Sequence, residues 1–117
     1  MTPRTTALAF LGHLAEGAPD RAAALLAPDA VMTFPGGATF RDLAELAAWS
    51  APRYARIAKR IERAEESAGA VYVSGTLEGA WPDGTPFSGI RFIDRFEVAD
   101  GLILRQEVWN DMAEHRP

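Results

Sequence analysis

The stretch from Gly89 to Val98 alternates between two kinds of side chain at every second position, which predicts a long β-strand with two different faces. One face is apolar except for a single carboxylate, and it carries Ile90, Phe92, Asp94, Phe96 and Val98. The other face is mostly charged, and it carries Arg91, Ile93, Arg95 and Glu97. Burying an unpaired carboxylate is costly, so an acid in such a row is paired, protonated or used in chemistry. Asp94 is therefore the first candidate functional residue.

The length of 117 residues predicts a single domain spanning residues 1–117. The chain has no cysteine, and its two histidines, His13 and His115, lie too far apart in sequence to form a ligand motif. Its net charge of -4 comes from interleaved acids and bases, unlike the basic surface of a nucleic-acid-binding protein. We therefore expect neither a metal site nor a nucleic-acid partner.

No apolar run in the sequence approaches the length of a membrane-spanning helix, and the first six residues lack the apolar core of a signal peptide. The absence of cysteine also fits a reducing compartment. We expect a soluble, cytoplasmic protein without a membrane partner.

Helical patterns dominate the first half of the chain. Leu8, Leu11 and Leu14 recur at helical spacing, a short second helix is predicted over residues 20–26, and a third helix begins with a capping box at residues 42–45. Between the last two helices, residues 30–34 read as a strand that ends in a Pro-Gly-Gly turn, and residues 39–40 read as a short return strand.

The second half of the chain predicts antiparallel hairpins. Strands are expected over residues 70–78, 87–98 and 102–111, separated by turn signals rich in Gly, Asp and Pro. Residues 112–117 are expected to fray. Helices in the first half of the chain followed by β-hairpins in the second half predict an α+β fold. We expect a curved antiparallel sheet with the N-terminal helices on its concave face.

Three pieces of sequence carry a resemblance to a known family: Leu26-Ala27-Pro28-Asp29-Ala30-Val31-Met32-Thr33-Phe34-Pro35, Ile93-Asp94-Arg95-Phe96 with Asp100-Gly101, and Val108-Trp109-Asn110-Asp111. In this order and spacing the chain resembles the nuclear transport factor 2-like superfamily, and within it SnoaL-like proteins and ketosteroid isomerases. The resemblance covers nearly the whole chain and implies a cone-shaped fold, with the element order α-α-β-α-β-β-β-β. It also implies a strand over residues 59–66, where propensity alone favours a helix.

The resemblance also implies roles for individual residues. Ketosteroid isomerases use a general-base aspartate, an oxyanion-hole tyrosine and a protonated acid. Asp94 matches the protonated acid, and His13 lies near the position of the tyrosine. The general base falls on Phe34, which cannot accept a proton. The resemblance thus implies a cofactor-free acid–base enzyme (an isomerase, cyclase, dehydratase or hydrolase) that acts on a hydrophobic carbonyl or polycyclic compound by a different mechanism.

Asn110 and Asp111 end the last predicted strand, and only one of them faces the pocket because adjacent strand residues point to opposite faces. The candidate catalytic residues are Asp94, Asp111 and His13. The candidate substrate-binding residues are Phe34, Trp49, Tyr54, Phe92, Phe96, Trp109 and Asn110. Each has a purely structural alternative: an ion pair with arginine for Asp94, strand-end capping for Asp111, a position at the helix edge for His13, and core packing for the aromatic residues.

The competing hypothesis is a non-catalytic binding or dimerisation module with the same fold. The loss of the aspartate at Phe34 favours this module, and the inward acid at Asp94 favours the enzyme. An Asp94 fully paired with arginine, or a cavity closed by aromatic side chains, would exclude the catalytic role. The charged outer face of the strand that carries Asp94 suggests a homodimer, as the family's convex face often forms one.

Overall fold

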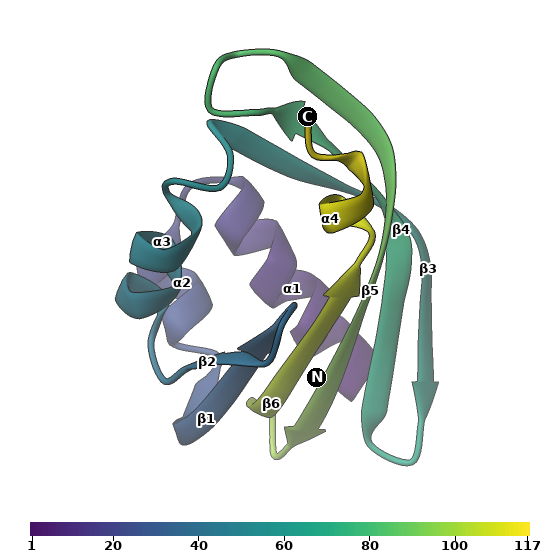
Figure 1. Ribbon diagram of the computed structural model, residues 1–117. Coiled ribbons are helices and arrows are strands. Elements are labelled where there is room, and N and C mark those ends of the chain that lie inside the picture. The colour runs from purple at the N-terminus through teal and green to yellow at the C-terminus, as the bar shows by residue number, and fades with distance from the viewer.

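A curved six-stranded sheet wraps around the N-terminal helices, so that α1 lies along its concave side (Figure 1). The computed structural model describes residues 1–117. Its elements are α1 (Pro3–Ala15), α2 (Pro19–Ala23), β1 (Leu26–Phe34), β2 (Ala38–Phe40), α3 (Leu43–Ser50), β3 (Arg56–Ser67), β4 (Ala70–Ala80), β5 (Pro86–Ala99), β6 (Leu102–Asn110) and α4 (Met112–His115). The predicted α+β fold class is confirmed.

Local sequence explains where the two main helices begin. The Thr2 side chain accepts a hydrogen bond from the backbone N–H of Thr5 at 3.1 Å, and Pro3 occupies the first turn of α1. The Asp42 carboxylate accepts from the backbone N–H of Glu45 at 2.8 Å and so caps α3. The buried side of α1 carries Phe10, whose ring packs edge-on against Phe96 of β5 with centroids 6.0 Å apart.

The strands lie in the order β2-β1-β6-β5-β4-β3. Neighbouring strands run antiparallel with one exception, because β1 and β6 run parallel. The sheet is therefore mixed rather than wholly antiparallel as the sequence predicts. Hairpins have local turn signals, whereas the pairing of two strands from opposite ends of the chain has none. None of the helices is long and apolar enough to cross a membrane.

The edge strand β3 confirms the predicted strand over residues 59–66, and it pairs with β4 along its length. Two glycines of β4 allow this close pairing. A Cβ added at Gly75 would lie 1.9 Å from the carbonyl oxygen of Arg60, and one added at Gly79 would lie 2.1 Å from the carbonyl oxygen of Arg56. Any side chain at either position would push β3 away, so these glycines set how closely the edge strand is held.

Two boundaries differ from the sequence-based expectation. The second helix ends at Ala23, and β1 begins at Leu26 instead of residue 30, because Leu26 pairs with Ile103 of β6. The segment predicted to fray contains α4, in which Met112 is buried and donates its backbone N–H to the Asn110 side chain at 3.0 Å. For β1 a contact with a distant strand overrides the local signal, and for α4 the burial of Met112 in the hydrophobic core does so.

Candidate functional site

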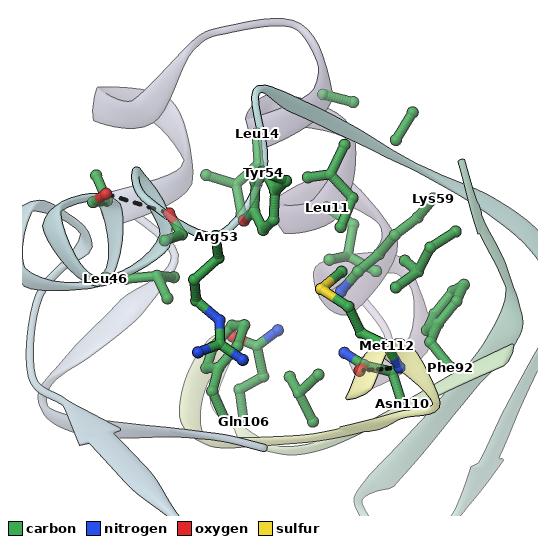
Figure 2. Close-up of a pocket in the computed structure, with 18 of the residues that line it drawn as sticks. Leu11, Leu14, Leu46, Arg53, Tyr54, Lys59, Phe92, Gln106, Asn110 and Met112 are labelled. Atoms are coloured by element: carbon green, nitrogen blue, oxygen red, sulfur yellow. Dashed lines mark hydrogen bonds between the residues drawn. The ribbon is translucent and has the colours of Figure 1, made fainter. Parts of the chain in front are cut away.

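A cavity of about 490 Å³ lies between the concave face of the sheet and the helices α1 and α3 (Figure 2). Of its 25 lining residues, 17 are hydrophobic, so the few polar groups that reach it stand out. The polar and charged side chains are those of Ser50, Arg53, Tyr54, Lys59, Gln106 and Asn110. Lys59 comes from β3, and Gln106 and Asn110 come from β6. Ser50 is the last residue of α3, and Arg53 and Tyr54 lie in the segment that follows it. No aspartate, glutamate or histidine lines the cavity.

Aromatic rings form one wall of the cavity. Phe34 at the end of β1 packs edge-on against Trp49 of α3, with centroids 5.8 Å apart, and both residues line the cavity. Phe40 lies behind them, 6.0 Å from Phe34 and 5.4 Å from Trp49. The Arg53 guanidinium lies over the Trp49 ring, 4.1 Å from its centroid. This wall therefore offers a flat apolar surface with a cation at its edge.

Asp94 is completely buried, as the alternation in β5 predicts. Its cross-strand neighbours are Val73 of β4 and Val108 of β6, so its immediate surroundings on the sheet are apolar. Lys59 and Gln106 both donate to Asp94 Oδ2, Gln106 Nε2 at 3.4 Å, whereas Asp94 Oδ1 has no hydrogen-bond partner. We call Lys59, Asp94 and Gln106 the polar cluster.

The polar cluster reaches the cavity through Lys59 and Gln106. Both residues line the cavity, but Asp94 does not. The Lys59 side chain keeps 24% of its surface exposed, and its ammonium lies 5.1 Å from the centroid of the Phe92 ring. Asp94 is thus paired with a lysine through one oxygen, not fully paired with an arginine, and the cavity is open. The ion pair with Lys59 therefore partly meets the structural alternative for Asp94, whereas the cavity is not closed by aromatic side chains.

The other predicted catalytic residues lie apart from the cavity. The Asp111 carboxylate accepts a hydrogen bond from Arg91 Nε at 2.5 Å on the outside of the sheet. His13 is partly buried on α1 and is not among the lining residues. Between the two adjacent candidates at the end of β6, it is Asn110 that faces the cavity. The three candidate catalytic residues therefore do not converge on a common point.

Five of the seven predicted substrate-binding residues line the cavity: Phe34, Trp49, Tyr54, Phe92 and Asn110. Phe96 does not, because it is fully buried against Phe10 in the core. Trp109 does not either, because strand alternation places it on the convex face, where 51% of its surface is exposed.

Sequence reasoning missed Lys59 and Gln106. Lys59 is the single lysine of the chain, whereas the other basic residues are all arginine. It lies between Ile57 and Ile61 at period two, so it shares the cavity-facing side of β3 with them. The family resemblance assigns residues 59–66 to a strand, but alternation along that strand does not show that Lys59 contacts Asp94. Gln106 has the same kind of signal, because it alternates with Val108 and Asn110 along β6.

Comparison with protein families finds a match to the SnoaL-like domain over residues 7–106. This match confirms the resemblance that the sequence motifs carry. No curated protein matches the chain.

Solved structures of similar shape cover nearly the whole chain. An NTF2-like protein of unknown function from Burkholderia pseudomallei is 21% identical, with a TM-score of 0.85 over 97% of this chain and 95% of that chain. TerC, co-crystallised with polyporic acid, is 20% identical, with a TM-score of 0.86 over 97% and 95%. IdmH, a putative polyketide cyclase from Streptomyces antibioticus, is 20% identical, with a TM-score of 0.79 over 97% and 94%. At these identities the likeness establishes the fold.

Proposed function

Because this chain belongs to the SnoaL-like domain family, we propose that it is an acid–base enzyme that binds a hydrophobic carbonyl compound in its cavity. The observation that carries the proposal is Lys59, an ammonium group in a mostly apolar wall that is held from behind by a fully buried carboxylate. Buried ion pairs are a poor source of stability, since apolar residues in their place are often as stable or more so. A function in the cavity gives the pair a reason to be there.

The Lys59 ammonium has three N–H donors, and Asp94 accepts from it. The remaining donors are free to bind a carbonyl oxygen of a compound in the cavity. When a proton leaves the carbon next to that carbonyl, negative charge develops on the oxygen, and a fixed cation in an apolar site stabilises this charge. Isomerisation and aldol-type cyclisation both pass through such an enolate. In this scheme Asp94 positions Lys59 and does not touch the substrate.

No group that could serve as a strong base lines the cavity, since its charged side chains are both cationic and Phe34 takes the place of the ketosteroid isomerase aspartate. We propose that a hydroxide ion from solvent removes the proton from carbon and becomes water, while the Lys59 ammonium stabilises the negative charge that remains on the enolate oxygen. Asp111 and His13 have no part in this scheme, because neither lines the cavity. The names of two similar proteins support a cyclic or polyketide-type substrate by analogy: IdmH and a SnoaL-like protein from Jannaschia are both described as putative polyketide cyclases.

The test is hydrogen–deuterium exchange at carbon. The protein is incubated in heavy water with 2-acetylnaphthalene, a flat aromatic ketone, and the loss of its methyl proton signal is followed by NMR. We expect exchange that depends on the protein and that falls about 100-fold in Lys59→Met, the usual effect of removing one oxyanion donor. Arg63→Met, on an exposed part of the edge strand, should exchange at the wild-type rate.

Since Lys59→Met leaves Asp94 buried and unpaired, the double variant Lys59→Met/Asp94→Leu provides a folded protein without the ammonium group. Exchange at the wild-type rate in this double variant would overturn the proposed role of Lys59. Binding of the ketone without any exchange in the wild-type protein would favour the second candidate, a ligand-binding module. The observation that favours this module is the absence of any carboxylate or imidazole from the cavity lining.

We also propose that the protein forms a homodimer through the convex face of the sheet. Trp109 and Ile93 lie opposite each other on β6 and β5, and they are 51% and 39% exposed. Tyr72 of β4 is 38% exposed and lies beside Arg95, which separates it from the acidic side chains of the same face. Large apolar side chains flanked by opposite charges are typical of a protein interface.

A further inference from the structure

The charges around the cavity have one sign. The chain as a whole is acidic, with 16 aspartates and glutamates against 12 lysines and arginines. The cavity lining reverses this balance, because its charged residues are Arg53 and Lys59 and it contains no acid. A site lined by one sign of charge between low-dielectric walls concentrates ligands of the opposite sign. This excess of positive charge therefore indicates that the ligand is an anion.

The two cations differ in how their charges are balanced. Lys59 is paired with the buried carboxylate of Asp94, so its charge is compensated within the protein. Arg53 forms no ion pair and no side-chain hydrogen bond, and its guanidinium rests on the face of Trp49. Burial and the nearby positive charge of Arg116 lower the pKa of Arg53, with a smaller opposing effect from Tyr54. A negative group beside Arg53 would offset the repulsion from Arg116 and favour the charged form of the guanidinium.

Figure 2 shows the Arg53 guanidinium extending into the open space of the cavity, on the side of Leu46 and above Gln106, whereas Lys59 enters from the side of Phe92 and Met112. The two cationic groups therefore approach a bound molecule from different sides. The guanidinium carbon lies over the Trp49 ring, and the guanidinium N–H groups have no hydrogen-bond acceptor in the protein. A planar fork of N–H donors fits the two oxygens of a carboxylate.

We propose that the ligand is an amphiphilic organic anion, a flat hydrophobic molecule with one carboxylate that pairs with Arg53 while its apolar body lies between the aromatic wall and Lys59. The proposal rests on the proposed function, since it describes the substrate of the same cavity and leaves Lys59 for the carbonyl group. A cavity of about 490 Å³ lies within the usual range for small-molecule sites and accommodates a fused-ring compound. Arg53 is then the residue that selects an acid over a neutral analogue.

Calorimetric titration with two compounds of nearly equal shape tests this proposal. The first is 2-naphthoate, and the second is 2-acetylnaphthalene, in which a methyl group replaces the charged oxygen. We expect the carboxylate to bind about tenfold more tightly than the ketone, the scale of one charge-assisted hydrogen-bonded pair. In Arg53→Met the carboxylate should lose this advantage, whereas the affinity for the ketone stays unchanged. Arg53→Lys should retain part of the preference.

Arg63→Met is the matched control, because it removes the same charge from an exposed position on the edge strand. It should leave both affinities unchanged, which separates direct pairing from the effect of net charge. Equal binding of the two compounds by the wild-type protein, an equal loss of both in Arg53→Met, or no binding of either compound overturns the proposal.

The two proposals fail in different ways. A preference for the carboxylate that depends on Arg53, without deuterium exchange in any ketone, refutes the enzymatic function and leaves the anion site. Exchange that depends on Lys59, without a preference for the carboxylate, refutes the anion site and leaves the enzymatic function.

Discussion

The two faces of the sheet hold their charges in opposite ways. On the concave side a single ion pair, Lys59 with Asp94, lies in an apolar environment, and the Asp94 side chain is completely buried. On the convex side Arg95 donates to both Glu97 and Glu107 at 3.0 Å, and Arg105 contacts Glu97 at 3.6 Å. The side chains of this second group are 27% to 54% exposed.

This difference shows on which face the loss of one charged contact is compensated by other partners. Each member of the convex group has water or a second partner available, so the loss of one contact is compensated. Asp94 has Lys59 as its one cationic partner, and its other oxygen has no hydrogen-bond partner. A protein that needed only stability would place an apolar residue at Asp94. The concave pair is therefore the one that indicates function, although the convex face contains more ion pairs.

The largest effect is expected when the ion pair between Lys59 and Asp94 is broken. Lys59→Met leaves the Asp94 carboxylate buried without a counter-charge, and we expect the free energy of unfolding to fall by about 3 kcal/mol, the low end for such pairs because Lys59 is partly exposed. Urea unfolding followed by circular dichroism measures the change. Lys59→Met/Asp94→Leu should recover most of the loss. If Lys59→Met were as stable as the wild type, the ion pair between Lys59 and Asp94 would not be desolvated.

An intermediate effect is expected at the apolar part of the convex face. Trp109→Glu places a charge in the proposed dimer interface, and we expect the dissociation free energy of the dimer to fall by about 2 kcal/mol, the scale of an interface hot spot. Analytical ultracentrifugation over a range of concentrations measures the change. Trp109→Phe keeps a large apolar side chain and should remain dimeric. A wild-type protein that is monomeric at high concentration contradicts the proposed homodimer.

The smallest effect is expected within the convex charges. Arg95→Gln removes the centre of an exposed group, so we expect the free energy of unfolding to fall by less than about 1 kcal/mol. Screening should make the difference smaller still at high salt. Thermal unfolding of the two proteins at low and high salt measures it. A loss as large as that of Lys59→Met would remove the contrast between the two faces.

The effect of pH on this last variant follows from the pKa of Arg95. Its hydrogen bond to Tyr72, and then those to Glu97 and Glu107, raise the pKa of Arg95 above its usual value. A base whose pKa is raised in the folded state contributes stability below its unfolded-state pKa and loses it as the pH rises through the folded value. Protonation of Arg95 itself therefore does not change its contribution anywhere in the neutral pH range.

The face occupied by Asp94 could be predicted from sequence, whereas its partner could not. The alternation around Asp94 is local and fixes its side of β5 once that strand is assigned. Lys59 belongs to β3, and β4 lies between the two strands. Opposite Lys59 in β4 is Leu77, and opposite Asp94 is Val73, so the lysine side chain crosses the concave face diagonally. Such a contact depends on two registers and on the irregular pairing in β3 beyond Ile61, none of which a local pattern encodes.

The choice between Asn110 and Asp111 shows the same limit on a smaller scale. Alternation predicts that only one of the two faces inward, but it does not say which one. The answer depends on the pairing of Asn110 with Phe92 at the end of β6 and on the α4 turn that follows. Aromatic residues were easier to place, since four of the six predicted aromatic substrate-binding residues line the cavity. The exceptions, Phe96 and Trp109, belong to the same strands as residues that do line it.

The position of β6 has a consequence for synthesis of the protein. This strand is the last of the six in sequence, yet it lies inside the sheet between β1 and β5. Until it is complete, β1 and β2 have only each other, and an isolated two-stranded hairpin is marginally stable at best. β5 meanwhile exposes an unpaired edge that invites pairing with another chain. A chain truncated before β6 is therefore prone to aggregation and lacks the Gln106 and Asn110 side of its cavity.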